Sequence, residues 1–458
     1  MKVLFVYTNI NGFHEDCYSI GLASIVAMTR QSGHEAKMVT VVTKEEYQKV
    51  LEAVNEFEPK IVGFSSVSSQ FHFVKEIAAL IKERYSDVIT VCGGVHPTIN
   101  QTCILETKSL DGIFIGESEL SFAQFLEKIE QEEPYKDTDN FAWADNGKLV
   151  INKCKPLVSD LDKLPYPDKD IHSFKETLEK TGVAPFFFSR GCPYLCTYCS
   201  NHALAKVYGF HSNPTRYRSP ESSVREIEEV MEKFSISSIT IGDDIFGINK
   251  KWRTEFLQKY KDRIKIKFNC LLRVNVVDDE FIRLLKEAGC YRISFGVESG
   301  NDYIRNKVMK RQMKREQIVN AFALVRKYGL ETTSLNIIGV PGETEEMIKD
   351  TIKLNREIRP TYSGINIFYP YKGTELGDYC FEQNLVNREL YDSFSSERRD
   401  TVLNYPVEQR EMLVHYRENW EKLVYPFDLK RTFLNSARKT VAWKYLRSLK
   451  RLALNRKH

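Results

Sequence analysis

The chain has 458 residues, of which 42% are hydrophobic and 28% charged, with a formal net charge of +4. These proportions are ordinary for a soluble globular protein of two or three domains, and the small charge says little about partners. No stretch approaches the roughly 20 apolar residues of a membrane-spanning helix, and residues 1–7 lack the features of a signal peptide, so we expect a cytoplasmic protein.

The first part of the chain alternates between strand and helix patterns. Apolar runs predict strands at 3–7, 36–42, 61–65, 88–92 and 112–115, and periodic stretches predict helices such as 22–31, 73–85 and 121–131. This alternation is typical of an α/β fold with a parallel, doubly wound sheet. A polar stretch at 132–140 and a proline-bearing stretch at 156–168 suit a linker.

A second alternating series begins near Pro185. Strand patterns lie at 186–189, 238–242, 264–272, 291–296, 332–338 and 364–369, and helical patterns at 220–234, 252–261, 279–288, 315–328 and 343–359. Six strand–helix units predict a partial (β/α)6 barrel that binds ligands at the C-terminal ends of its strands. We therefore expect a domain at 1–135, a linker at 136–184, a barrel at 185–385 and a helical region at 386–458.

Three of the ten cysteines lie close together. Cys192, Cys196 and Cys199 fall within eight residues on a loop that leaves a predicted strand, so their thiolates can turn onto one iron–sulfur cluster. A four-iron cluster held by three cysteines keeps one iron open to chelate a ligand. The alternative is a structural zinc site, which requires a fourth ligand such as His202. The other cysteines are scattered, and we expect buried thiols.

This cysteine spacing, with the aromatic Tyr198 just before the last cysteine, resembles the signature of the radical S-adenosylmethionine (SAM) superfamily. The resemblance covers about residues 185–376. It implies a [4Fe-4S] cluster whose open iron binds the amino and carboxylate groups of SAM, and it implies cleavage of SAM to a 5′-deoxyadenosyl radical. It also implies that Tyr198 lies against the adenine.

Other strand ends match the positions where that superfamily binds SAM. Asp243 or Asp244 would bind the amino group, in place of the more common Gly-Gly-Glu, and helix capping is the alternative. Arg273 would meet the carboxylate or else form a surface salt bridge. Glu298 would bind the ribose hydroxyls, and Gly339 would let the backbone approach the adenine closely.

Turns rich in hydroxyl groups and glycine end three strands of the first domain. They form a predicted slot that consists of Ser65, Ser66, Gly93, Gly94, Gly116 and Glu117. These turns resemble those of the cobalamin-binding domain that precedes many radical SAM cores, over about residues 1–135. The resemblance implies that the nucleotide tail of cobalamin enters this slot.

The loop after the first strand lacks the Asp-x-His-x-x-Gly motif with which cobalamin-dependent mutases ligate cobalt. His14 lies in that loop but outside any such motif. The same absence is usual in the radical SAM branch, which implies a cobalt without a protein imidazole. We therefore expect His14, His72 and His96 to be surface or packing residues.

These features together predict a cobalamin-dependent radical SAM enzyme that methylates an unactivated carbon. In that scheme one SAM methylates the cobalt and another yields the radical. Alternatives are a cyclisation, ring contraction or oxidation that uses cobalamin as an electron carrier, and a non-catalytic cobalamin carrier or sensor. A methylthio-transferase would need further cluster cysteines. We expect a small-molecule substrate, an electron donor such as flavodoxin or ferredoxin, and no nucleic acid.

The C-terminal segment after Asp428 contains no acidic residue. An apolar stripe at helical spacing, with Trp443 near its boundary, consists of Leu434, Ala437, Val441, Tyr445, Leu449 and Leu452. The basic residues fall largely off that stripe. This pattern predicts either peripheral contact with an anionic membrane, and then a lipid-linked substrate, or a helix packed on the barrel.

Overall fold

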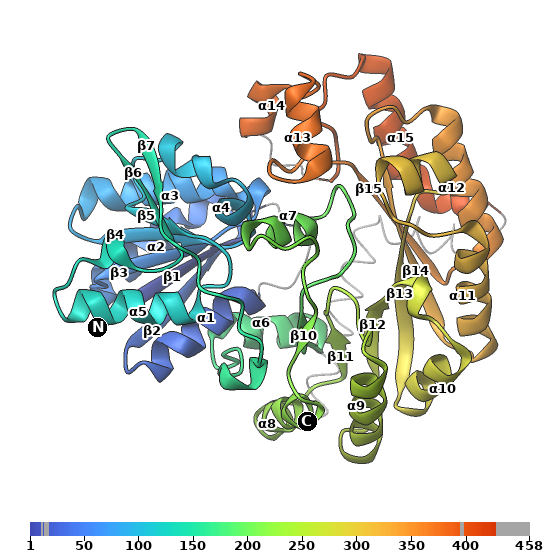
Figure 1. Cartoon of the computed structure of the whole chain (residues 1–458), viewed down its shortest axis with the longest axis horizontal. Coiled ribbons are helices and arrows are strands. Elements are labelled where there is room, and N and C mark those ends of the chain that lie inside the picture. Colours follow the sequence, from blue (N-terminus) through green and yellow to red (C-terminus); the bar gives the residue numbers. More distant parts are fainter. Residues whose placement is uncertain (11, 13–17, 394–397, 427–458) are drawn as a thin grey trace.

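A computed structural model describes residues 1–10, 12, 18–393 and 398–426 of the chain. Two α/β units lie side by side, and helix α7 (Ser200–Val207) lies between them (Figure 1). Within the described residues, no helix has the length and apolar character needed to cross a membrane. His14 and the C-terminal segment after Asp428, with its apolar stripe and its basic residues, lie outside the described residues.

The N-terminal unit contains a seven-stranded sheet in the order β2-β1-β3-β4-β5-β6-β7. The strands from β1 to β5 pair in parallel, and this part has the 2-1-3-4-5 order of a doubly wound fold. All five predicted strands of this domain are confirmed. The strand bounds are β1 (Lys2–Thr8), β2 (Glu35–Val41), β3 (Ile61–Ser65), β4 (Ile89–Gly93), β5 (Gly112–Phe114), β6 (Phe141–Asp145) and β7 (Lys148–Ile151).

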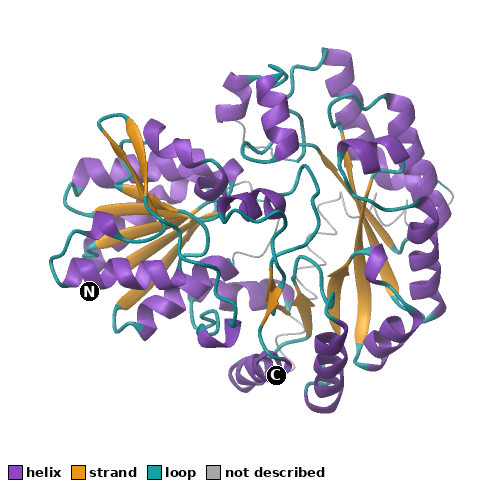
Figure 2. Cartoon of the chain, in the orientation of Figure 1, coloured by secondary structure: helices purple, strands orange, loops and turns teal. Residues whose placement is uncertain are grey.

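Helices cover both faces of this sheet (Figure 2). Residues of α1 and α5 join one core with Phe5, and residues of α2 and α3 join a second core with Leu4 and Val6 on the other face. This split follows from the alternation of side chains along β1. The helix bounds are α1 (Ile20–Gln31), α2 (Tyr47–Phe57), α3 (Phe71–Arg84), α4 (Val95–Ile99) and α5 (Glu119–Glu130).

The sheet extends beyond the predicted boundary at residue 135. Strands β6 and β7 form an antiparallel hairpin that pairs with β5. Asn146 and Gly147 form its turn, with φ angles of 48° and 77°. An Asn-Gly turn with positive φ at both positions is a strong hairpin signal, and our linker interpretation of this segment overlooked it.

The second unit is an open parallel sheet of six strands in the order β15-β14-β13-β12-β11-β8. The sequential order confirms the predicted partial barrel and places the C-terminal ends of all six strands along one edge. The strand bounds are β8 (Val183–Phe186), β11 (Ser238–Ile241), β12 (Phe268–Leu272), β13 (Cys290–Glu298), β14 (Glu331–Ile338) and β15 (Tyr362–Ile367).

Helices cover the outer face of the barrel sheet, and a helical region follows β15 (Figure 1). Ser219 caps the first of the barrel helices by accepting a hydrogen bond from Ser222 N. The bounds are α8 (Pro220–Lys233), α9 (Lys250–Arg263), α10 (Asp279–Glu287), α11 (Arg315–Lys327), α12 (Glu345–Ile358), α13 (Glu375–Glu382), α14 (Arg388–Ser393) and α15 (Val407–Val424). Leu413 and Trp420 of α15 pack against Ile352 and Ile367.

The segment between the two units contains α6 (His172–Thr181) and continues one unit's core into the other. The rings of Phe174 and Tyr18 lie 5.0 Å apart, and Phe174 belongs to the same core as Phe186 of β8. Lys169, which is 7% exposed, lies 3.3 Å from the carboxylate of Glu226. The two units therefore share a hydrophobic core.

Candidate active site

The three clustered cysteines lie on a closed loop at the C-terminal edge of the barrel sheet. Two short strands, β9 (Ser189–Arg190) and β10 (Arg216–Tyr217), pair in antiparallel fashion and bring the ends of this loop together. Gly191 has a φ of 89°, and a Cβ atom there would lie 2.4 Å from the carbonyl oxygen of Pro214. This turn therefore requires glycine.

The thiols of Cys192, Cys196 and Cys199 are close enough to influence one another electrostatically. Burial raises the pKa of Cys192 to about 11 and that of Cys199 to about 12. Holding such groups as thiolates requires nearby positive charge, and a bound metal supplies it by deprotonating a coordinating thiol.

The described part of the chain contains no group of three or more His, Cys, Asp or Glu residues arranged to hold a single metal ion. His202, the predicted fourth zinc ligand, directs its Nδ1 toward the carboxylate of Glu375 at 4.0 Å. The ligands of a four-iron cluster bind different iron atoms, so they stand further apart than the ligands of one ion.

Two guanidinium groups lie against Cys196, whose exposed fraction is 5%. The Nη1 atoms of Arg273 and Arg311 lie 3.7 and 3.6 Å from its Sγ. Arg273 stacks over the ring of Tyr194 at 3.6 Å and is 2% exposed, so the alternative of a surface salt bridge is wrong. Nη2 of Arg273 and Nε of Arg311 are buried without a hydrogen-bond partner, which makes them available to an anionic ligand.

The two aspartates after β11 have different surroundings. Asp243 is fully buried and accepts hydrogen bonds from Phe188 N at 2.7 Å and Ser189 Oγ at 2.6 Å, so its carboxylate ties β11 to the start of the cysteine loop. Asp244 is exposed and lies near Cys192 and Cys199. Of the predicted pair, only Asp244 presents a carboxylate to the cysteine site.

Glu298 ends β13 beside the same site. Its φ is 65°, a conformation that non-glycine residues adopt at a cost of roughly 1–3 kcal/mol and that is frequent at functional sites. Its carboxylate lies 3.8 Å from Arg311 and close enough to Tyr198 to interact with it electrostatically. Burial raises the pKa of Glu298. Glu298 is therefore a neighbour of Tyr198 in the cysteine loop.

The turn after β14 is held by the residues around it. Gly339, with a φ of 81°, donates its N–H to Glu343 Oε2 at 2.6 Å, and its carbonyl accepts from Tyr405 at 3.2 Å. Burial raises the pKa of Glu343 to about 8, and its other oxygen, Oε1, has no hydrogen-bond partner. The side chain of Glu343 therefore holds the turn at Gly339 in place by accepting a backbone hydrogen bond.

The predicted slot of the N-terminal unit is a set of closely packed turns. Gly94 has a φ of 97°, and a Cβ atom there would lie 2.7 Å from the carbonyl oxygen of Ser66 and 3.0 Å from Ser65 Oγ. Thr98 connects two of the turns, because its hydroxyl donates to Gly94 O at 2.7 Å and accepts from Gly116 N at 3.0 Å. The neighbouring Gly93 completes the double-glycine turn at the end of β4.

The histidines of this unit pack within it, as predicted, where the structure describes them. The ring of His96 lies 4.4 Å from that of Phe71, and its Nδ1 lies 3.0 Å from Ser68 Oγ. The rings of His72 and Phe73 lie 3.7 Å apart.

The turn after β5 meets the cysteine loop directly. Glu117 N donates to the hydroxyl of Tyr208, which directly follows α7, at 2.6 Å, and a Cβ atom at Gly116 would overlap that hydroxyl. The Glu117 carboxylate lies 3.2 Å from Arg190 and also pairs with Arg216. Glu117 is therefore engaged by barrel arginines, which differs from its predicted role as a cofactor contact.

Comparison with known families accounts for both halves of this arrangement. Residues 186–354 match the radical SAM superfamily, and residues 8–126 match the B12 binding domain. The chain is a radical SAM enzyme with a B12-binding domain. These two families imply SAM, a [4Fe-4S] cluster and cobalamin as cofactors.

Several related proteins resemble this radical SAM enzyme over most of its length. An uncharacterised methyltransferase of Pyrococcus horikoshii is 27% identical over 374 residues, which cover 80% of this chain and 79% of that protein. An anaerobic magnesium-protoporphyrin IX monomethyl ester cyclase of Rubrivivax gelatinosus is 24% identical, over 93% of this chain and 79% of the cyclase. The structure of the methyltransferase TsrM from Kitasatospora setae superimposes with a TM-score of 0.70 at 17% identity, over 83% of this chain and 76% of TsrM.

The residues of this enzyme fit the implied groups. Three gathered thiols suit a cluster with one open iron, and the unpartnered N–H groups of Arg273 and Arg311 suit a carboxylate beside it. The missing Cβ atoms at Gly94 and Gly116 accommodate Ser66 and Tyr208 of the protein itself, which packs these turns closely together.

Sequence reasoning missed Arg311, Thr98 and Tyr208. Arg311 lies in an irregular segment, and no periodicity distinguishes it from the neighbouring basic residues. The prediction of Tyr208 as an interdomain residue would have required the relative position of the two units.

Proposed function

We propose that this chain is a cobalamin-dependent radical SAM methyltransferase that methylates an unactivated carbon of a small molecule. The contact of Tyr208 with the β5 turn carries the proposal. Helix α7 begins directly after Cys199, and Tyr208, which follows the last residue of α7, reaches the turn at Gly116 and Glu117. This contact supports a shared substrate space between the cysteine site and the predicted cobalamin slot.

When bound, the cluster and SAM supply a 5′-deoxyadenosyl radical for hydrogen abstraction, and cobalamin supplies the methyl group that the substrate carbon accepts. In this proposal Cys192, Cys196 and Cys199 hold the cluster. Asp244 binds the SAM ammonium group, because both carboxylate oxygens of Asp243 already accept hydrogen bonds from within the fold. The unpartnered N–H groups of Arg273 and its neighbour Arg311 bind the carboxylate.

The remaining SAM contacts follow the positions of the strand ends. Glu298 binds the ribose hydroxyls, Tyr198 lies against the adenine, and the turn at Gly339 approaches the adenine edge. Ser65, Ser66 and the double-glycine turn enclose the tail of cobalamin. The interdomain ion pairs of Glu117 hold the β5 turn against the barrel. The role of Glu117 is therefore to position this turn of the slot.

A second candidate function is oxidative cyclisation without methyl transfer. The similarity to the Rubrivivax cyclase over 93% of this chain favours it. The relatives described as methyltransferases favour the first candidate. Radical SAM enzymes typically use a small-molecule substrate and a reductant, and we propose a flavodoxin or ferredoxin as the reductant here. The membrane prediction rests on the C-terminal stripe and has no support from the described residues.

The test is an anaerobic assay of the reconstituted full-length chain with cobalamin, a chemical reductant and SAM that carries a deuterated methyl group. We expect both 5′-deoxyadenosine and S-adenosylhomocysteine, and transfer of the deuterated methyl group to a carbon when candidate substrates are screened. Mass spectrometry detects all three products.

Cys199→Ala should lose the iron and both SAM-derived products, whereas Cys154→Ala, a control at another half-buried cysteine, should retain them. Formation of 5′-deoxyadenosine without S-adenosylhomocysteine would favour the cyclase-like candidate. Retention of the iron and of both products in Cys199→Ala would overturn the assignment of the site.

A further inference from the structure

Arg311 has no expected role in the radical SAM resemblance, yet it contacts the most buried of the three cysteines. Its side chain is 11% exposed. Besides the contact with Cys196 Sγ at 3.6 Å, it donates to Gly296 O and lies 3.8 Å from Glu298. A Cβ atom at Gly296 would lie 2.8 Å from Nη2 of Arg311, so glycine leaves room for this guanidinium.

The backbone that presents Arg311 is irregular and strained. Its neighbours Lys310 and Gln312 both have positive φ angles, of 50° and 51°. Such non-glycine conformations persist only where the surrounding structure imposes them, because they are unfavourable on their own. The contacts that impose this conformation should therefore be identifiable nearby.

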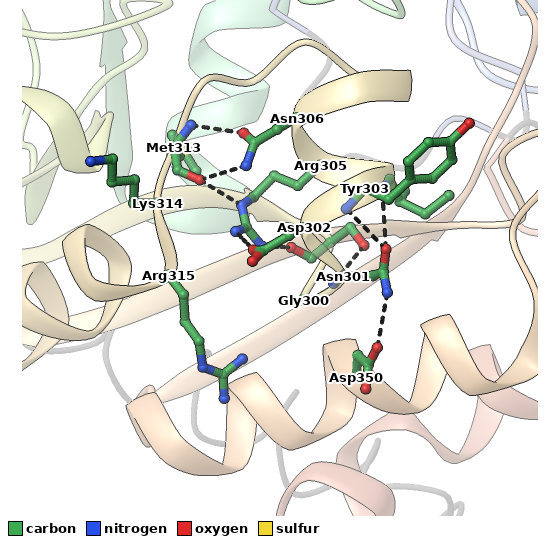
Figure 3. Close-up of polar contacts among 12 residues, drawn as sticks. Gly300, Asn301, Asp302, Tyr303, Arg305, Asn306, Met313, Lys314, Arg315 and Asp350 are labelled. Carbon is green, nitrogen blue, oxygen red and sulfur yellow. Dashed lines mark hydrogen bonds and ion pairs between the residues drawn. The ribbon is translucent and has the colours of Figure 1, made fainter.

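Arg305 supplies those contacts (Figure 3). Its side chain is fully buried, and it donates from Nε to Met313 O and from Nη1 to Ser299 O, both at 2.9 Å. Its Nη2 pairs with Asp302. The Arg305 carbonyl also accepts from Arg311 N at 2.9 Å. Arg305 thus holds both ends of the segment that carries Arg311.

Asn306 makes a second connection to the same segment. Its amide accepts from Met313 N at 2.9 Å and donates to Met313 O at 3.0 Å (Figure 3). Arg305 and Asn306 lie in a π-helical turn, Ile304–Val308, a rare conformation that is frequent at functional sites.

This turn also anchors the cysteine loop. Thr197, next to Cys196, donates its hydroxyl to Val308 O at 2.7 Å and its N–H to Met309 O at 3.3 Å. The same short segment therefore sets the positions of Cys196 and of Arg311 relative to each other.

We propose that Arg311 raises the reduction potential of the cluster and that Arg305 is the positioning residue that keeps it against Cys196. The proposal rests on the proposed function only in requiring a cluster on the three cysteines. In the one-electron reduction of [4Fe-4S]2+ to [4Fe-4S]+, no bond forms or breaks. The electron comes from a low-potential reductant such as a flavodoxin-class protein.

The sign of the effect follows from electrostatics. With three cysteinates, the net charge of the cluster becomes more negative by one unit on reduction. A guanidinium fixed beside a ligand sulfur stabilises the reduced form more than the oxidised form, and hydrogen bonds to the sulfurs tune such potentials. Removal of the charge should therefore lower the potential.

The experiment is a redox titration of the anaerobically reconstituted full-length chain, with dithionite as the reductant and electron paramagnetic resonance as the readout. Iron content is measured in parallel. We expect Arg311→Gln to retain its iron and to titrate at a lower potential. The matched control is Arg315→Gln, because Arg315 carries the same charge on the next helix but pairs with Glu357 and is 38% exposed.

A double-mutant cycle tests the role of Arg305. Arg305→Gln should lower the potential in the wild-type background but produce no further shift in the Arg311→Gln background, because it acts through Arg311. Arg305→Lys, which keeps the charge and some donors, should restore part of the shift. If Arg305→Gln does not fold, Asn306→Ala takes its place in the same cycle.

Three results of the titrations would decide against the proposal: equal potentials, additive shifts or no shift. Equal potentials for Arg311→Gln and Arg315→Gln would overturn the tuning role. Additive shifts in the cycle, or no shift from Arg305→Gln and Asn306→Ala, would overturn the positioning role. Absence of a cluster from the wild-type chain would instead overturn the proposed function, and iron content distinguishes that failure from the others.

Discussion

At the scale of single residues, the two adjacent aspartates after β11 show how burial separates structural from functional candidates. Both were equal candidates in the sequence. In the structure, the carboxylate of Asp243 satisfies Phe188 N and Ser189 Oγ, whereas Asp244 remains exposed beside the thiols. Because a ligand ammonium needs an accessible carboxylate, the two positions should respond differently to substitution.

We expect Asp244→Ala to weaken SAM binding roughly ten- to hundred-fold, the loss of one charge-assisted hydrogen bond, with little change in stability. Asp243→Ala should lower the free energy of unfolding by roughly 1–3 kcal/mol, because it leaves buried donors unpaired. Equilibrium dialysis of the reconstituted chain and denaturant unfolding measure the two effects. A larger loss of stability in Asp244→Ala than in Asp243→Ala would contradict this division.

Glu343 makes the stability of the fold depend on pH, in a direction that follows from its burial. Burial raises its pKa to about 8, so the folded chain retains a proton that the unfolded chain releases above its ordinary pKa. Stability therefore falls by roughly 1.4 kcal/mol per pH unit between the ordinary value and about 8. Glu343→Gln keeps an acceptor for Gly339 N and should remove this dependence.

We accordingly expect Glu343→Gln and the wild-type chain to differ little in stability at pH 5, and the variant to be the more stable at pH 8.5. Thermal unfolding at the two values measures the difference. If the difference in stability between variant and wild type were the same at both pH values, the pKa of Glu343 would not be raised in the folded chain.

At the scale of elements, the sequence predicted those strands and helices that have a strong hydrophobic periodicity. The first five strands and five of the barrel strands lie where apolar runs indicated them, with shifts of a few residues at the ends, whereas β8 precedes its predicted range of 186–189 and shares only Phe186 with it. Apolar runs are informative here because parallel strands are buried on both faces. The β6–β7 hairpin was missed because its outer strand is half exposed, which left the Asn146-Gly147 turn as the main signal.

The candidate site was predictable to the extent that its residues lie at strand ends. The cysteines, Asp244, Arg273 and Glu298 each follow a strand of the barrel, and parallel strands bring such positions to one edge. Arg311 and Arg305 lie in an irregular loop whose shape depends on long-range hydrogen bonds. No local pattern in the sequence determines those contacts, so the structure was needed to find them.

At the scale of the whole molecule, the position of the B12-binding unit is set by buried charges as well as by apolar packing. Arg190 and Arg216 of the barrel meet Glu117 and Glu119 of the N-terminal unit. The side chain of Arg216 is 9% exposed. Loss of Arg216 would leave the carboxylate of Glu117, which is 23% exposed, with Arg190 as its remaining ion-pair partner.

We expect Arg216→Met to lower the free energy of unfolding by roughly 1–3 kcal/mol, because Glu117 and the carbonyl oxygen of Val158 each lose a donor. Arg315→Met is the control, because it breaks an ion pair with Glu357 in which the two side chains are 38% and 43% exposed, and such pairs contribute about 0–1 kcal/mol. Denaturant unfolding of the full chain compares the two. Similar losses for both variants would indicate that the interdomain pairs are effectively solvated.

The shared core has a consequence for engineering. Phe5, Leu22 and Phe122 of the N-terminal unit belong to the same apolar cluster as Phe174 of α6 and Phe186 of β8. A B12-binding unit excised at its last strand would expose that surface to water, and a foreign unit grafted in its place would have to match it. Exchange of cobalamin-binding modules between such enzymes should therefore succeed only when α6 and its flanking segment are transplanted together with the module.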